Sequence, residues 1–365
     1  MQKPDKAANI AAGILTSLGK PTDPLDFASK MRLKQELELQ RDATKQAQRK
    51  LHTFRNESKK VEQQVGELNQ IEKAPVTPFN ITPSISSGLS ETVPVLLLSD
   101  WHWEEPVLAG AVRGINEYNP TIYKERFNRL IRKAVNLVNY RRKTNTRIDE
   151  MVIWFGGDFI TGHIHDENKM TSAVSPPEAS IVAQGDLKFL IEEILRLTGI
   201  KRLIIPCNVG NHARTTEKTW IGTMARTNFE AMIYHSLQMI FKNDPRVHFI
   251  LPAGQFTEYR VFDKFNIRFS HGDAIKFGGG IGGLMVPMKK RIAAWNADHN
   301  EAYMDCMGHW HTFTPNRRFI VNGSMIGYNT YAQWLGFAPE DPIQTLFYIE
   351  RQHGLTAVEP IYLNK

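Results

Sequence analysis

The stretch Arg202-Leu203-Ile204-Ile205-Pro206-Cys207, followed closely by Gly210-Asn211-His212, decides the fold of this chain. After its first residue the run is continuously apolar, which is typical of a strand buried on both faces of a parallel sheet. The chain then turns at a glycine and presents an amide and an imidazole. Open α/β sheets carry their reactive loops at the carboxyl ends of their strands, so the stretch predicts an α/β fold with chemistry at that end.

Apolar runs and amphipathic segments extend this pattern along the chain. Strands are expected at 95–98, 151–155, 202–206, 247–251, 257–262, 265–270, 302–306, 318–322, 343–350 and 356–362, and helices at 121–143, 178–198, 220–242 and 284–297. Strands and helices alternate in the first half, and strands dominate the second. This order predicts an α/β fold, α+β-like in its second half, in which two sheets form a sandwich flanked by helices.

Residues 24–73 are rich in Lys, Glu, Gln and Arg and predict a long N-terminal helix. One set of positions along it alternates steps of four and three, the a/d spacing of a coiled coil. The set is Leu33, Leu37, Gln40, Thr44, Ala47, Leu51, Phe54, Ser58, Val61, Val65 and Leu68. Three of these eleven positions are polar. Pairing with a second copy or a partner protein, packing on the chain's own α/β domain, and a solvated arm all stay open.

The composition shifts again before the first apolar strand. Residues 74–92 contain three prolines and no Lys or Arg, which is typical of a linker. We therefore expect a helical arm at 1–75, a linker at 76–92 and an α/β domain at 93–365.

Charge and cysteine content restrict the setting of the protein. The net charge is +7 over 365 residues, and residues 1–75 carry 14 Lys+Arg against 10 Asp+Glu. This mild excess favours polyanionic partners modestly. No run approaches the roughly 18 apolar residues of a membrane span. Two cysteines build no disulfide framework, so a cytoplasmic protein without a membrane partner is expected.

Five polar clusters each follow a predicted strand. They are Asp100-Trp101-His102, Gly156-Gly157-Asp158, Gly210-Asn211-His212, His271-Gly272-Asp273 and Gly308-His309-Trp310-His311. If each cluster continued its strand, side chains two apart would share a face, so Asp100 with His102, and His309 with His311, would approach an ion together. The mixture of carboxylates, imidazoles and an amide suits manganese, iron or zinc. Seven candidate ligands are too many for one tetrahedral ion but natural for two ions that share a carboxylate.

With these motifs in this order, the sequence resembles the calcineurin-like metallophosphoesterase superfamily. The family order is Asp-x-His, Gly-Asp, Gly-Asn-His, His and Gly-His-x-His, and the resemblance covers roughly residues 93–325. It implies that Asp100, His102 and His311 hold one metal, that Asn211, His271 and His309 hold the other, and that Asp158 bridges them. It also implies two divalent ions, most readily Mn²⁺ with Fe or Zn as alternatives, a shared water of lowered pKa, and His212 as the acid that protonates the leaving oxygen.

Two departures from the family pattern bear on the substrate. Ala213-Arg214 follows Gly-Asn-His where many members have an acidic residue, and Arg214 is either a clamp for phosphate or a structural residue. Nucleases of double-strand-break repair within this superfamily often have a His three residues after the bridging Asp. In this chain that position is Thr161, with His163, His165 and Asp166 beyond it.

The expected function is a DNA nuclease resembling the exonucleases of double-strand-break repair. A basic face on the helix at 121–143, with Arg126, Arg129, Arg132 and Lys133, is either a nucleic-acid contact or a solvated face. The run Gly278–Gly283 predicts a loop over the site mouth. A phosphatase or phosphodiesterase acting on a nucleotide or phosphoprotein, and a non-catalytic scaffold, are the alternatives.

Overall fold

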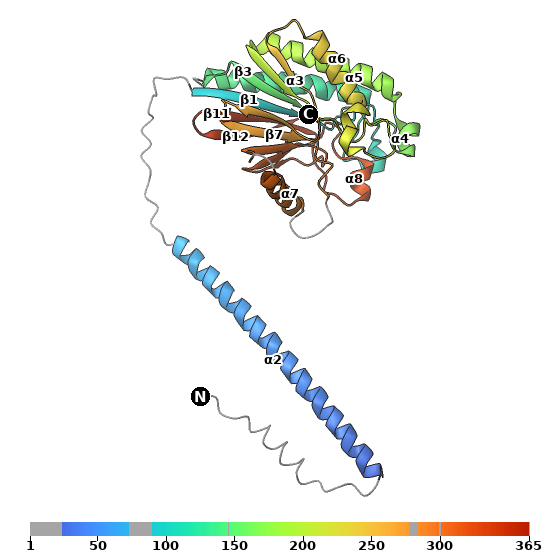
Figure 1. The fold of residues 1–365 in the computed structure, drawn as a ribbon, viewed down its shortest axis with the longest axis vertical. Coiled ribbons are helices and arrows are strands. Elements are labelled where there is room, and N and C mark those ends of the chain that lie inside the picture. The colour runs from blue at the N-terminus through green and yellow to red at the C-terminus, as the bar shows by residue number, and fades with distance from the viewer. Residues whose placement is uncertain (1–23, 73–89, 145, 277–282, 299–300, 365) are drawn as a thin grey trace. The chain divides into compact units, whose positions relative to one another are not determined.

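A computed structural model of the chain describes residues 24–72, 90–144, 146–276, 283–298 and 301–364. The chain divides into two units, Met1–Ser84 and Ile85–Lys365 (Figure 1). The division falls inside the range expected for the linker, most of which lies outside the described residues.

In the first unit a single helix, α2 (Pro24–Glu72, 49 residues), covers the range of the heptad pattern. Its residues are strong helix formers, and Pro24 stands at the first turn, where proline is tolerated. Three of the seam side chains whose exposure the structure describes are well exposed within this unit: Leu33 by 59%, Leu51 by 50% and Phe54 by 68%. A partner for this seam stays a prediction.

The first sheet of the second unit has the strand order β12-β11-β1-β3-β4-β5, with β2 beside β1. Its strands are β1 (Ser90–Leu98), β2 (Thr146–Arg147), β3 (Glu150–Phe155), β4 (Arg202–Pro206), β5 (Val247–Ile250), β11 (Ile343–Glu350) and β12 (Gly354–Tyr362). Strands β1, β3, β4 and β5 run parallel, and β11 joins β1 antiparallel. The last two strands of the chain thus return to the sheet that the first strands built.

The second sheet has the order β6-β7-β8-β10-β9. Its strands are β6 (Thr257–Val261), β7 (Phe265–Ser270), β8 (Met304–Met307), β9 (Thr314–Pro315) and β10 (Phe319–Val321). Strands β7, β8 and β10 are parallel neighbours. The carboxyl ends of β7 and β8 therefore lie side by side.

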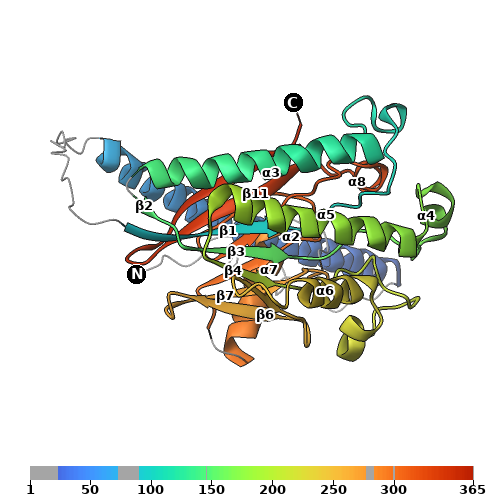
Figure 2. The same cartoon turned by 90° about the horizontal axis from the view of Figure 1, so that it is seen from above.

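Alternation along β1 shows how the two sheets pack. Val95 and Leu97 belong to a buried cluster with Ile267 and Cys306 of the second sheet, whereas Leu96 belongs to a cluster with the helices of the other face. Those helices are α3 (Pro120–Lys143), α5 (Pro176–Thr198) and α6 (Phe229–Ile240). Helix α7 (Met285–Asp298) covers the outer face of the second sheet. The unit is a two-sheet sandwich flanked by helices, as predicted (Figures 1 and 2).

The helix expected at 220–242 is wrong in its first turns. A 3₁₀ helix at Ile221–Arg226 precedes α6, and the side chain of Asn228 caps α6 by accepting from the Glu230 amide. Asn competes with helix formation in this way and favours a new start. Two short helices, α4 (Asp166–Thr171) and α8 (Thr330–Trp334), were not expected. Figure 2 shows both beyond the same end of the sheets.

The basic face expected on α3 is partly internal. The guanidinium of Arg126 is buried and donates to the Met325, Ile326 and Glu117 carbonyls and to the Asn116 side chain. Two more basic residues of α3 bind the end of the chain, Arg129 at the Leu363 carbonyl and Lys133 at the Tyr362 carbonyl. Carbonyl groups outside the regular sheet need donors, and these side chains supply them. They therefore give no support to a nucleic-acid contact.

We predict that Arg126→Met lowers the free energy of unfolding by roughly 2–4 kcal/mol, because several buried acceptors lose their donor. Arg132→Met, on the exposed part of the same helix, is the matched control and changes it by less than about 0.5 kcal/mol. Urea denaturation of both variants measures the difference. Equal effects would show that the Arg126 hydrogen bonds do not stabilise the unit.

Candidate metal centre

The five polar clusters lie at the carboxyl ends of five strands from both sheets. Asp100 and His102 follow β1, Asp158 follows β3, and Asn211 and His212 follow β4. His271 follows β7, and His309 with His311 follows β8. Because parallel strands end at a common edge, the packed sheets bring all five loops to one place.

Ligand atoms converge there in three groups, each with all its atoms within 4.8 Å of one another. The groups are Asp100 with His102 and His311, Asp158 with His271 and His309, and His102 with Asp158 and His212. The first group has the same residues as the set that the family resemblance implies for one metal. The second combines His271 and His309 of the other implied set with Asp158. The third shares His102 with the first group and Asp158 with the second.

The amide of Asn211 belongs to the same constellation. Its Oδ1 lies 3.1 Å from Nε2 of His271, which also lies 3.0 Å from Oδ2 of Asp158. All seven candidate ligands are thus brought together. Asp100, His102, Asp158 and His271 are buried, and Asn211, His309 and His311 are half-buried at the open side.

The backbone geometry differs from the extended one expected for Asp100 with His102 and for His309 with His311. All four residues, and Asp158, have positive φ, between 44° and 69°. They lie in loops beyond the strand ends, so strand alternation is the wrong reason for their convergence. Non-glycine residues rarely adopt this region, although Asp, Asn and His tolerate it better than most. Left-handed turns aim successive side chains into the site at a cost of about 1–3 kcal/mol each.

Backbone hydrogen bonds hold the first two loops together. The amides of Trp101 and His102 both donate to the Asp158 carbonyl, at 2.8 and 3.1 Å. The Asp100 amide donates to the Gly157 carbonyl at 3.0 Å. Backbone hydrogen bonds between the segments that follow β1 and β3 therefore continue into the site, where the backbone is no longer extended.

Glycines permit the closest approaches between loops. A Cβ on Gly157, whose φ is +86°, would lie 2.1 Å from the Gly210 amide nitrogen. A Cβ on Gly210 would lie 1.9 Å from Oδ1 of Asp158, and one on Gly308 would lie 2.4 Å from Oδ2 of Asp100. The glycines of three motifs are thus explained by packing, since no larger residue fits there.

Thr161 contacts two histidines of the site. Its Oγ1 lies 3.1 Å from Nδ1 of His102, and its carbonyl oxygen lies 3.2 Å from Nδ1 of His212. A carbonyl only accepts, so Nδ1 of His212 carries the hydrogen. The Thr161 amide in turn donates to the buried carboxylate of Glu104 at 2.7 Å. Such outer contacts fix the orientation of ligand histidines.

The side chain of Glu230 links the second and third loops through their backbone amides. Its two carboxylate oxygens accept from the amides of Phe159 and Gly210, each at 2.7 Å. The side chain is fully buried, and burial together with the charge of Asp158 raises the pKa of Glu230 to about 8. Gln344 of β11 plays a similar part for the first loop, since it accepts from the Ser99 amide and the Trp101 indole.

The charges within the site are arranged in pairs. Burial would raise the pKa of Asp158, but the positive charge of His271 holds it well below its ordinary value. The pKa of His271 is correspondingly raised despite burial, by Asp158. Burial and the charge of His271 lower the pKa of His309 to about 3. The two buried carboxylates thus require positive charge, which protons or metal cations provide.

The residues fit a metal centre. The buried Nε2 of His102 has no hydrogen-bond partner among the described residues, while its Nδ1 is held by Thr161. Nδ1 of His271 lies 2.8 Å from the Gly156 carbonyl, so that nitrogen donates and Nε2 is left as a ligand. This pattern, one ring nitrogen anchored and the other aimed inward, is that of metal-binding histidines. Two carboxylates, imidazoles and an amide suit manganese, iron or zinc.

Arg214 uses its guanidinium on its own loop. It donates to the carbonyls of Asn211, Thr216 and Glu217. The side chain thereby orders the segment that carries Asn211 and His212. A direct contact with phosphate stays a prediction.

Other residues near the motifs differ in how they relate to the site. Trp101 and Trp103, which flank His102 in the sequence, pack in the core at 0% and 5% exposure, so they present no face to a substrate. The ring of His165 lies 6.0 Å from that of His212, whereas the contact that orients His212 comes from Thr161. Most of the Gly278–Gly283 run lies outside the described residues.

Sequence reasoning named Thr161 only as a departure from a His, and it missed Glu104, Glu230 and Gln344. Each acts on the backbone or outer ring nitrogens of the site. Glu230 lies on a helix and Gln344 on a strand, where polar residues are common, so only a buried polar position in an otherwise apolar run would have marked them.

Comparisons with known proteins add little. No family model and no curated protein matches the chain. Among the solved structures that match, one crystal structure has 11% sequence identity and a TM-score of 0.33, over 73% of this chain and 98% of its own. A likeness this weak carries no argument about fold or function.

In the part of the chain that the structure describes, no helix combines the length and the apolar character needed to cross a bilayer.

We predict that Gly157→Ala destabilises the domain by at least about 3 kcal/mol, because the added methyl group meets Gly210 and the backbone disfavours an L side chain. The loops around Asp158 would separate, and metal affinity would fall. Gly185→Ala in α5, where nothing lies within 4 Å, is the control and stabilises by about 0.5–1 kcal/mol. Thermal denaturation compares them; a neutral Gly157→Ala would mean that the loops have room.

Proposed function

We propose that this protein is a two-metal phosphoesterase of the calcineurin-like metallophosphoesterase type, and that it hydrolyses phosphodiester bonds in nucleic acid. The observation that carries the proposal is the pair of ligand groups Asp100/His102/His311 and Asp158/His271/His309, together with a third group, His102/Asp158/His212, that shares His102 with the first and Asp158 with the second. A carboxylate shared by two imidazole-rich groups is the arrangement that two-metal hydrolases need.

In this proposal Asp100, His102 and His311 hold one ion, Asn211, His271 and His309 hold the other, and Asp158 contacts both. When bound, the two ions supply a nucleophilic water at neutral pH and offset the charge of the phosphate. The best-suited metal is Mn²⁺, with Fe or Zn as alternatives.

His212 is the proposed general acid. It is half-buried, its Nδ1 donates to the Thr161 carbonyl, and its amide donates to Oδ1 of Asp158 at 2.9 Å. These contacts fix the ring and leave Nε2 to hold the proton that the leaving oxygen receives. Arg214, by ordering residues 211–217, keeps that ring in place.

Exposed aromatic residues near the centre support nucleic acid as the substrate. Tyr331 and Trp334 of α8 are exposed by 64% and 80%, and their rings lie 6.4 Å apart. The N-cap of α8, Asn329, binds Glu105 at 3.1 Å, and Glu105 lies 4.0 Å from Nδ1 of His102. Exposed rings beside a phosphate site suit the stacking of unpaired bases.

A phosphatase or phosphodiesterase for a nucleotide or phosphoprotein is the second candidate, because the same ligands would serve it. A non-catalytic scaffold is the third. Cytoplasmic location and pairing through residues 24–73 stay predictions.

We expect the protein to bind two Mn²⁺ ions per chain and to cleave DNA. Asp158→Asn should reduce cleavage by on the order of 10³-fold, since the shared carboxylate is lost. Calorimetry counts the ions, and a panel of single- and double-stranded DNA, a phosphate diester and a phosphate monoester measures activity. Hydrolysis of the phosphate monoester without cleavage of DNA would contradict the nuclease function. Binding of two ions without hydrolysis of any substrate would favour the non-catalytic scaffold.

We predict that the effect of His212→Ala depends on the leaving group. Cleavage of DNA, whose leaving alkoxide needs a proton, should fall by about 10²–10⁴-fold. Hydrolysis of bis(p-nitrophenyl) phosphate should fall far less, because nitrophenolate leaves as a stable anion. Metal stoichiometry should stay at two. Equal losses on both substrates would exclude the acid role, and loss of an ion would make His212 a ligand.

A further inference from the structure

We infer that helix α2 is a nucleic-acid-binding arm, whose basic stripe grips the phosphate backbone of the substrate. The stripe is formed by Arg41, Lys45, Arg49, His52, Arg55 and Lys59. The inference deepens the proposed function and rests on it only for the choice of nucleic acid as the polyanion.

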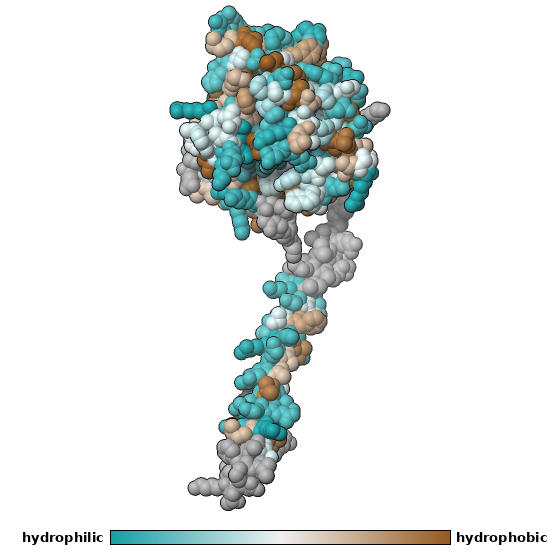
Figure 3. Space-filling model, turned by 90° about the vertical axis from the view of Figure 1, so that its right-hand side faces the viewer, coloured by the Kyte–Doolittle hydropathy of each residue, from teal (hydrophilic) through white to brown (hydrophobic). Residues whose placement is uncertain are grey.

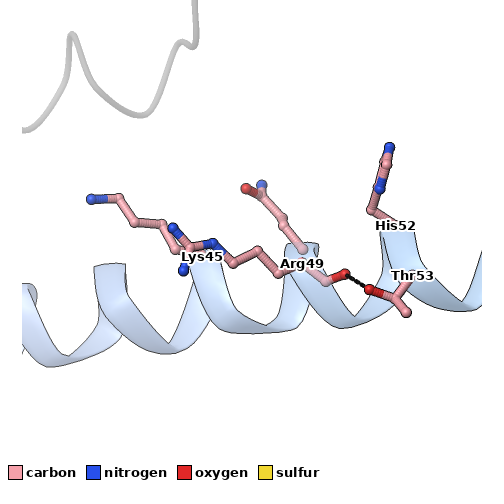
Figure 4. Close-up of a pocket in the computed structure, with 5 residues that line it drawn as sticks. Lys45, Arg49, His52 and Thr53 are labelled. Carbon is pink, nitrogen blue, oxygen red and sulfur yellow. Dashed lines mark hydrogen bonds between the residues drawn. The ribbon is translucent and has the colours of Figure 1, made fainter. Parts of the chain in front are cut away.

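The spacing of these residues puts them on one face of the helix. Their steps are of three and four residues, which stack side chains along one side. Figure 4 shows Lys45, Arg49 and His52 following one another along α2. The stripe extends over about 27 Å at 1.5 Å per residue, close to eight base pairs of duplex at roughly 3.4 Å each.

Positive charge is concentrated in residues 41–60, where the basic side chains form no ion pairs within the described part of the chain. Residues 41–60 hold seven Lys or Arg and two acidic residues, an excess of five positive charges. All twenty are exposed, and none of the seven cations forms an ion pair within the described part of the chain. Cations without acidic partners are free to replace the counterions of a phosphate backbone.

The stripe is distinct from the coiled-coil seam. Thr44, Ala47, Leu51 and Phe54 lie on a different face, at about 100° per residue. The helix can therefore use both faces, one for a protein partner and one for a polyanion.

An anionic membrane is the less suitable polyanion. A helix that lies in a membrane interface needs a broad apolar face. Here the face away from the stripe carries Gln40, Thr44 and Ser58 among its apolar residues. The surface of α2 is mostly hydrophilic with separate hydrophobic patches (Figure 3).

Binding of the full-length protein to a labelled duplex, measured by fluorescence anisotropy in EDTA over a series of salt concentrations, tests the inference without cleavage. The stripe variant is Lys45→Glu with Arg49→Glu. Its matched control is Arg32→Glu with Lys50→Glu, which changes the charge equally on the opposite side of the same helix.

The stripe variant should bind at least about tenfold more weakly, and the slope of log K against log salt should fall by roughly 2, because each lost phosphate contact contributes about 0.9. The control should keep the slope of the unmodified protein. Equal losses in both variants, no binding by the unmodified protein, or stripe-dependent binding to phosphatidylserine vesicles in place of DNA would each overturn the inference.

Hydrolysis of bis(p-nitrophenyl) phosphate with Mn²⁺ separates this inference from the proposed function. Both α2 variants should retain it, since α2 holds none of the candidate ligands. If the unmodified protein shows no hydrolysis but binds DNA through the stripe, the proposed function is wrong and the inference about α2 is still supported.

Discussion

The buried residue Asp158 is the constraint on which the site depends. Its carbonyl accepts from the amides that follow β1, its Oδ1 accepts from the His212 amide, and its Oδ2 contacts His271. Loops from β1, β4 and β7 are thus tied to one residue after β3. Those strands belong to two different sheets. The geometry of the centre therefore depends on how the two sheets pack against each other.

The loops around Asp158 are bent in ways that cost free energy. Five candidate ligands have positive φ, and Gly157, Gly210 and Gly308 pass within a distance that admits no side chain. Buried hydrogen bonds from Glu230, Gln344 and Thr161 offset this cost by satisfying the loop amides and ring nitrogens. The site is therefore held in shape by the protein, which is what a centre of preorganised ligands requires.

The two units divide the tasks of binding and chemistry in the proposed scheme. The candidate centre gathers two carboxylates and several imidazoles in a small buried volume, where a phosphate can be held only with cations present. The excess positive charge of α2 lies in a separate unit and is fully exposed. A polyanion long enough to reach both would gain affinity from the arm without any change at the centre.

The sequence by itself determined the class of fold and the inventory of the site. Continuous apolar runs marked strands β1, β3 and β4, and a polar cluster was found at the end of each, because parallel strands covered on both faces are mostly apolar. Only the tertiary structure decided how the ligands converge: through left-handed loops and not through strand alternation. Only the tertiary structure shows that Arg126 is buried and that Arg214 binds its own loop. Both guanidinium groups donate to backbone carbonyls that need donors, and no sequence pattern shows where such carbonyls lie.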